Sequence, residues 1–104
     1  MIAELTAGVR ALWLPVMAVS GDTIAMDANK AYEITVGKTL TLTLTSAEDT
    51  TIVNKWQGTF DTGSTAPTVT WPANVIWADT PTVVANTHYE FSIKLSSGKY
   101  YGFV

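Results

Sequence analysis

Hydrophobic and polar residues alternate along much of the chain, most clearly between residues 32 and 45. The apolar members of this pattern are Tyr32, Ile34, Val36, Leu40, Leu42 and Leu44, and threonines fill most of the positions between them. A period of two residues is typical of β-strands with one apolar and one polar face. Threonine is β-branched and suits a pleated surface. The pattern predicts two strands joined by a hairpin or bend at Gly37-Lys38.

Similar patterns predict further short strands, separated by turn signals at intervals of about ten residues. They cover residues 23–26, 51–56 with an extension at 59–61, 68–71, 75–77, 88–94 and 99–104. Gln57-Gly58 allows a bulge or bend between residues 51–56 and the extension at 59–61. Pro72 ends the strand that contains Trp71. Ser97-Gly98 lies between two alternating aromatic runs, which predicts a hairpin there.

The strands do not alternate with long helical patterns, so a parallel α/β sheet is not expected. We predict an all-β fold, an antiparallel sandwich or jelly-roll-like barrel of about eight short strands. The predicted domain organisation is a short N-terminal arm over residues 1–20 and a single β domain over residues 21–104.

The N-terminal arm has its own apolar spacing. Ile2, Leu5, Val9 and Leu12 are separated by three, four and three residues, as on one side of a helix or in a coiled-coil seam. A strand from residue 9 to residue 14 is the alternative. In either form the arm is predicted to dock on another surface, as an anchor or an oligomerisation segment.

A nine-residue pattern occurs twice, 57 positions apart. Residues 28–36 and 85–93 share the order Ala-Asn-x-x-Tyr-Glu-apolar-hydroxyl-apolar. Asparagine tolerates a left-handed backbone, so each copy predicts a turn followed by a strand whose tyrosine faces the core. The two copies are either pseudo-equivalent hairpins, one per sheet, or independent uses of the same turn chemistry.

Composition limits the possible partners. The chain has 104 residues, of which 47% are hydrophobic and only 14% are charged, which indicates one folded core with a weakly charged surface. Its net charge is −3, and its six basic residues are scattered. Nucleic acid and anionic membrane surfaces are therefore not expected partners. The chain has no cysteine, which excludes disulfides and thiolate metal sites.

No catalytic group of residues is recognisable. His88 is the only histidine, and a general base or a metal site needs partners that the sequence does not place beside it. Glu33 and Glu90 occupy equivalent positions in the repeated pattern and are predicted to lie on solvated strand faces. The sequence therefore predicts a non-enzymatic protein with no catalytic, cofactor-binding or metal-binding residues.

Four tryptophans remain, at positions 13, 56, 71 and 77. Buried tryptophans would belong to the core or to a subunit boundary. Exposed ones could stack on sugar rings, and Trp56 and Trp77 are the candidates if they are exposed. A carbohydrate-binding, receptor-binding β module is thus the alternative function.

Several short motifs together resemble a known family. They are Phe60-x-Thr-Gly63, Thr68-x-Thr-Trp-Pro72, Asn74-Val-x-Trp77 and Ala85-Asn86-x-x-Tyr89-Glu90-x-Ser92-Ile93, and the Asn29-x-x-Tyr32 strand and the Leu40–Leu44 run fit the same pattern. They resemble a small β module of tailed-bacteriophage structural proteins of the head-fibre and tail-fibre type. The resemblance covers residues 27–104, and its motifs are turn and core positions.

The resemblance implies a homotrimeric protein on the surface of the virion. Its implied partners are its own copies and a phage capsid or tail protein, with a host surface glycan as a further possibility. The N-terminal arm, through Ile2, Leu5, Val9 and Leu12, would attach the trimer to the particle. Threonine-faced strands with few charges agree with side-by-side packing of identical subunits.

Overall fold

A computed structural model of the protein describes residues 15–45 and 53–104, which form nine β-strands and no helix. The strands are β1 (Val16–Ser20), β2 (Thr23–Met26), β3 (Ala31–Thr35), β4 (Thr39–Leu44), β5 (Asn54–Asp61), β6 (Thr68–Thr70), β7 (Val75–Trp77), β8 (His88–Ser96) and β9 (Lys99–Phe103). This part of the chain accordingly has no helix that could span a lipid bilayer.

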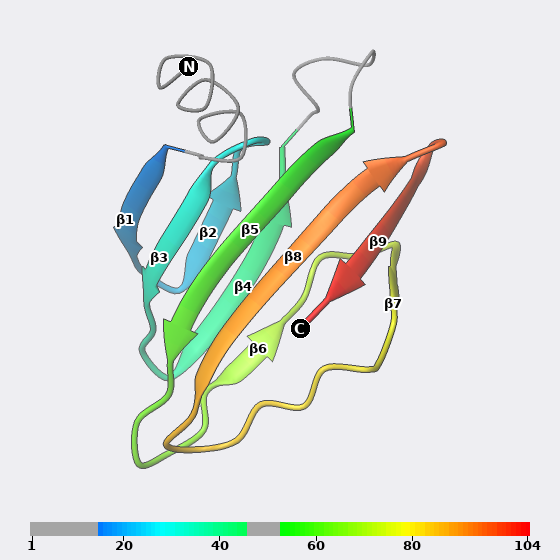
Figure 1. Ribbon diagram of the computed structural model, residues 1–104. Helices are drawn as coiled ribbons and strands as arrows, with labels where there is room; N and C mark the ends of the chain where they lie inside the picture. The colour runs from blue at the N-terminus through cyan, green and yellow to red at the C-terminus, as the bar shows by residue number, and fades with distance from the viewer. Residues whose placement is uncertain (1–14, 46–52) are drawn as a thin grey trace, which may run out of the picture.

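The strands form two sheets that enclose one core (Figure 1). The larger sheet has the strand order β1-β3-β5-β8-β9-β7, and the smaller one has the order β2-β4-β6. Each sheet contributes the apolar side of its alternating pattern, for example Leu40 and Leu42 from β4 and Tyr32 and Ile34 from β3. The predicted all-β fold is confirmed.

The first six strands wind as a flattened coil. Consecutive strands lie in opposite sheets, and each strand runs parallel to the one two places before it. The hairpin of β8 and β9 then extends the larger sheet antiparallel to β5, and β7 pairs in parallel with β9 at the far edge. We call the end of the coil at β1 and β2 the near end. At the other end, the far end, β8, β9 and β7 extend the larger sheet.

The predicted antiparallel pairing is wrong for most of the molecule. Only β5–β8 and β8–β9 are antiparallel, and the other five pairings are parallel. The bend at Gly37-Lys38 crosses from one sheet to the other, so β3 and β4 do not form a hairpin. Each of these turns moves the chain to the opposite sheet and reverses its direction. Two successive turns therefore bring it back to the first sheet in the original direction, which makes neighbouring strands parallel. The hairpin predicted at Ser97-Gly98 is confirmed, and both turn residues have positive φ, as a tight primed turn requires.

The predicted boundary at residue 20 is also too late. Residues 16–20 form β1 and pair with β3, so they belong to the larger sheet and not to an arm. The predicted anchor residues Ile2, Leu5, Val9 and Leu12 lie outside the described residues, and their role stays a prediction.

β5 is the central strand of the larger sheet, and it is continuous through Gly58. The bulge or bend predicted at Gln57-Gly58 does not occur. A Cβ atom at position 58 would lie 2.7 Å from Cζ of Phe91 and 3.2 Å from the carbonyl oxygen of Tyr32. Glycine is present there because the neighbouring ring needs the space, and not because the backbone turns.

The two copies of the repeated pattern lie on either side of β5, in the same sheet and not one per sheet. Asn29 and Asn86 both have left-handed φ values, 62° and 55°, as predicted. The N–H of Asn29 donates to the carbonyl of Lys55 near the start of β5, and the N–H of Asn86 donates to the carbonyl of Gly63 just after its end. The two turns therefore hold the two ends of the central strand.

Candidate functional site

The outer face of the smaller sheet carries almost only threonine. Its seven outward residues are Thr23, Ala25, Thr39, Thr41, Thr43, Thr68 and Thr70. Register places Thr41 between Thr23 and Thr70, so this residue lies at the centre of the surface. We call these seven residues the threonine face. It arises directly from the sequence, because Ile24, Leu40, Leu42 and their neighbours turn the other side of each strand inward.

A groove of about 390 Å³ extends the threonine face beyond β6. β6 ends at Thr70, and Pro72 has no N–H with which to continue the pairing to β4. The groove lies between the last part of β4 and the segment from Trp71 to Asn74, with Tyr100 in its wall. None of its lining residues is charged. The threonine face and the groove together form one uncharged surface.

The charged residues gather instead on the outer face of the larger sheet. Alternation along β3, β5 and β8 points Glu33, Lys55, Asp61, His88, Glu90 and Lys94 outward there. The two sides of the sandwich thus differ strongly in polarity. The difference has two causes. The charged residues occupy the outward-facing positions of their strands, and those strands all belong to the larger sheet.

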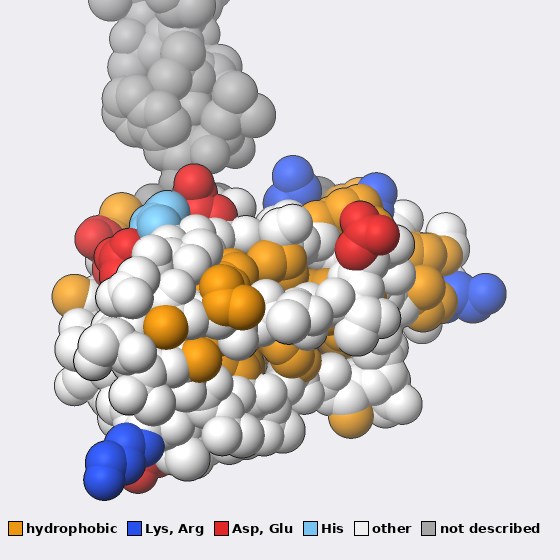
Figure 2. All heavy atoms as spheres, turned by 90° about the horizontal axis from the view of Figure 1, so that it is seen from below, with side chains coloured by type: hydrophobic (Ala, Val, Ile, Leu, Met, Phe, Trp, Pro, Cys, Tyr) orange, Lys and Arg blue, Asp and Glu red, His pale blue; other side chains and the backbone are white. Residues whose placement is uncertain are grey.

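His88 has acidic neighbours that the sequence analysis missed. Its Nδ1 lies 2.8 Å from Oδ1 of Asp61, the residue opposite it on β5, and its Nε2 lies 3.8 Å from Oε2 of Glu90. Figure 2 shows the histidine between acidic side chains on the open surface. All three side chains are more than half exposed to solvent. Only the register of β5 against β8 brings Asp61 to His88, and nothing local in the sequence indicates that register.

Glu33 and Glu90 are exposed, as predicted, and flank Thr59 from either side of β5. Two strand spacings separate their Cα atoms by about 10 Å. Both line a shallow hollow of about 320 Å³ that also includes Gln57 and Phe103. Across residues 15–45 and 53–104, no three His, Asp or Glu side chains are arranged to hold a metal ion.

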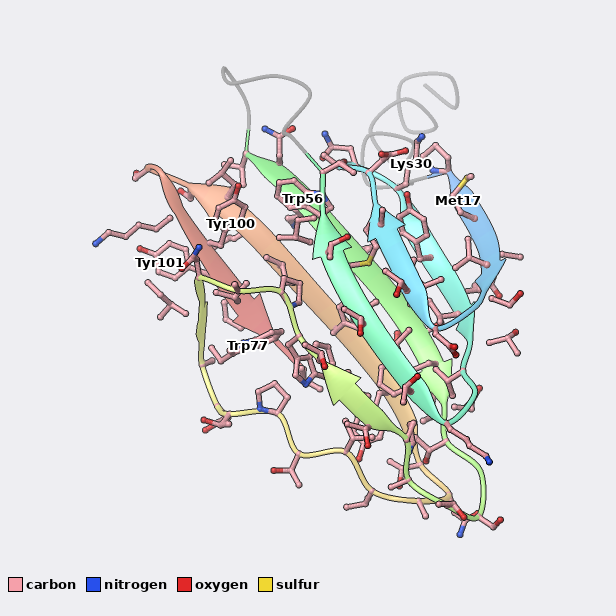
Figure 3. The ribbon with its side chains drawn as sticks, turned by 180° about the vertical axis from the view of Figure 1, so that it is seen from behind. Met17, Lys30, Trp56, Trp77, Tyr100 and Tyr101 are labelled. Carbon is pink, nitrogen blue, oxygen red and sulfur yellow. The ribbon has the colours of Figure 1, made fainter. Side chains whose placement is uncertain are left out.

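Of the described tryptophans, Trp56 lies in the core, and Trp71 and Trp77 pack against it while partly exposed. Trp56 has no exposed surface, and its ring centre lies 5.8 Å from that of Tyr100. Both residues are labelled in Figure 3. Trp77 is half-buried, and its ring packs edge-on against Trp71 and over Gly102. Trp56 therefore fails the condition of exposure on which its role in sugar stacking depended. Trp77 presents only part of its ring, because Trp71 and the backbone of β9 occupy the rest.

One indole group is unusual. Nε1 of Trp56 is buried, and no group of the described residues accepts a hydrogen bond from it. A buried unpaired donor costs free energy, on the order of 1 to 3 kcal/mol. The ring is held there by its packing, since β5 places it at the middle of the core.

Comparison with protein-family models, with curated proteins and with solved structures found no match for this chain.

Proposed function

We propose that the chain is a non-enzymatic structural component of a tailed-phage particle, on the virion surface, which works by packing against copies of itself. The family resemblance implies the phage particle and the trimer. The observation that supports self-association is the threonine face, a pleated surface whose strands carry no charged residue.

The chemistry of the threonine face favours contact with protein. Burying charged side chains costs free energy unless each is paired, and this surface has none to bury. Threonine methyl groups supply apolar area, and the hydroxyl groups can bond to one another across strands. The charged face of the larger sheet has the opposite character and is suited to water.

The size of the surface limits how it can be used. Three strands about 4.8 Å apart, with outward residues about 6.6 Å apart along each, cover only on the order of 200 Å². A stable interface buries roughly 800 Å² on each partner. The threonine face is thus the centre of the contact, and the adjoining groove with Pro72, Asn74 and Tyr100 extends it.

Attachment to the particle is assigned to the N-terminal segment. Residues 1–14 precede β1, and β1 is an outer strand of the larger sheet. A segment that precedes an edge strand can contact a capsid or tail protein while the threonine face contacts sister subunits. No carbohydrate-binding function is proposed, because of its two candidate residues Trp56 is buried in the core and Trp77 packs against the core with only part of its ring exposed.

Sedimentation of the purified full-length chain tests self-association. We expect a trimer at micromolar concentration, and we expect Thr41→Arg to dissociate it by placing a charge at the centre of the threonine face. Thr59→Arg is the matched control, because Thr59 lies at the middle of the charged outer face between Glu33 and Glu90. A monomeric wild type, or dissociation by Thr59→Arg alone, would overturn the proposal. Detection of the chain in purified phage particles by mass spectrometry tests the virion location.

A further inference from the structure

The near end of the coil presents two open strand edges. β1 and β2 are the outer strands of the two sheets at this end, and each pairs with one described neighbour only. Ala31 donates to the carbonyl of Pro15, and Thr41 donates to the carbonyl of Asp22. In a parallel pair, peptide groups alternate between the two sides of the strand. The N–H groups of Ala18 and Ala25 therefore point away from the molecule.

These edges lack the features that usually protect an exposed strand. Natural proteins blunt open edges with lysine, proline or other charged side chains. β1 has the sequence VMAVS and β2 the sequence TIAM, so neither contains any of these. Within residues 15–45 and 53–104, these two edges are therefore open to a further strand.

The edge is also stepped, because the larger sheet extends beyond the smaller one. Figures 1 and 3 show β1, with Met17, lying further out than β2. Met17 faces inward beside Tyr32, yet it is 38% exposed while Tyr32 is 4% exposed. Sheet β2-β4-β6 therefore covers the inner side of β3 and leaves part of the inner side of β1 open.

We propose that a second copy of this chain covers the stepped edge through a twofold axis parallel to the strands. Rotation about this axis places the partner's smaller sheet in line with the larger sheet of the first copy. It also places the partner's larger sheet in line with the smaller sheet of the first copy. β1 of each copy then pairs with β2 of the other, and the projecting β1 fills the partner's recess. Figure 1 shows β1 and β2 running in opposite directions, so both new pairings are antiparallel. The contact is isologous, as in most dimers.

The geometry of the stepped edge favours a second copy of this chain as the molecule that covers it. A single added peptide strand would satisfy one edge and leave the other open. A suitable partner must present two uncharged edges in two layers, offset by the same step. This chain's own edge meets that requirement, and the contact covers Met17 and Val16, which are both exposed in one subunit.

The proposal does not rest on the trimer. The edge contact uses the backbone edges of β1 and β2, whereas the threonine face uses outward side chains of β2, β4 and β6. With its twofold axis crossing the threefold axis of a trimer, the edge contact doubles that assembly. A chain that uses both contacts is a hexamer, and a chain that uses only the edge contact is a dimer. In either situation the loss of the edge contact halves the mass.

Proline substitution at an outward N–H group provides the test. Ala18→Pro, in the full-length chain, removes an outward edge donor from β1, retains the β1–β3 hydrogen bonds and leaves all seven residues of the threonine face unchanged. Light scattering after size exclusion is expected to give half the wild-type mass. Thr82→Pro is the matched control, since Thr82 is exposed, lies outside the strands and donates no hydrogen bond from its N–H to any described residue. Its mass is expected to equal that of the wild type.

A second variant guards against misfolding by proline. Met17→Lys keeps every backbone donor, leaves the threonine face unchanged and places a charge on the inner side of β1, where the partner would cover it, so it is also expected to halve the mass. Circular dichroism establishes that each variant retains its β-structure. Equal masses for the wild type and the folded edge variants would overturn the edge contact, whereas Thr41→Arg reports on the threonine face independently.

Discussion

Tyr32 and Tyr89 perform the same structural task 57 residues apart. The hydroxyl of Tyr32 accepts a 2.7 Å hydrogen bond from the N–H of Asp27, and the hydroxyl of Tyr89 accepts one of equal length from the N–H of Val84. In both places the donor lies five residues before the tyrosine, and a left-handed asparagine lies between them. The resemblance between the two segments is thus structural as well as sequential, and the two together hold the ends of β5.

Removal of these hydroxyls should destabilise the fold unequally. We expect Tyr32→Phe to lower the free energy of unfolding by about 1 kcal/mol, since the N–H of Asp27 loses its partner. Tyr89→Phe should cost less, because Tyr89 is partly exposed and water can replace its hydroxyl. Urea denaturation of both variants measures the difference. A larger cost for Tyr89→Phe would contradict the ranking.

Gly58→Ala should be destabilising because of Phe91. The added methyl group meets the Phe91 ring and the carbonyl of Tyr32, and overpacking of this kind costs about 1 to 3 kcal/mol. Gly63→Ala is the control, since nothing lies within 4 Å of a Cβ atom there. Thermal unfolding compares the two. Combination of Gly58→Ala with Phe91→Leu should recover part of the loss, and no recovery would show that the ring is not responsible.

Thr62 organises the end of β5 through its hydroxyl group. This buried hydroxyl donates to the carbonyl of Val84 and accepts from the N–H of Thr87. Thr62→Val keeps the shape of the side chain but leaves both groups without this partner, so we expect a loss of about 1 to 3 kcal/mol in denaturant titrations. Thr68→Val, on the exposed threonine face, should change stability by less than about 0.5 kcal/mol. Similar costs at both positions would argue against this role for the Thr62 hydroxyl.

Asp27 should give part of the acid sensitivity of folding. The hydrogen bond from Lys30, that from Thr45 and the charge of Lys30 lower the pKa of Asp27 in the folded state. A lowered folded-state pKa stabilises the protein above the unfolded-state pKa of about 3.9, and the stabilisation is lost as the pH falls through the folded-state value. As the pH is lowered from 6, the free energy of unfolding should therefore fall more steeply for the wild type than for Asp27→Asn. Asp79→Asn, which removes an exposed carboxylate in a bend, is the control, and an equal effect from it would contradict the prediction.

Local patterns predicted most strands and their buried sides. Leu40, Leu42, Tyr32, Ile34, Phe91 and Ile93 all lie in the core, as their alternation indicates. The asparagine turns and the Ser97-Gly98 hairpin were also predictable, because their chemistry lies within a few neighbouring residues. Gly58 was misinterpreted because a glycine required by a distant ring looks the same in sequence as a glycine required by a bend.

The sequence by itself determined that the chain is all-β, which side of each strand is apolar, and that one set of strands presents threonine. Only the tertiary structure decided which strands are neighbours. A period of two residues is the same in parallel and antiparallel strands, so β3 and β4 could equally have formed a hairpin or lain in opposite sheets. The uncharged threonine face, the meeting of Asp61 with His88 and the stepped edge at β1 and β2 all arise from that choice, since each depends on residues distant in sequence that only strand pairing brings together.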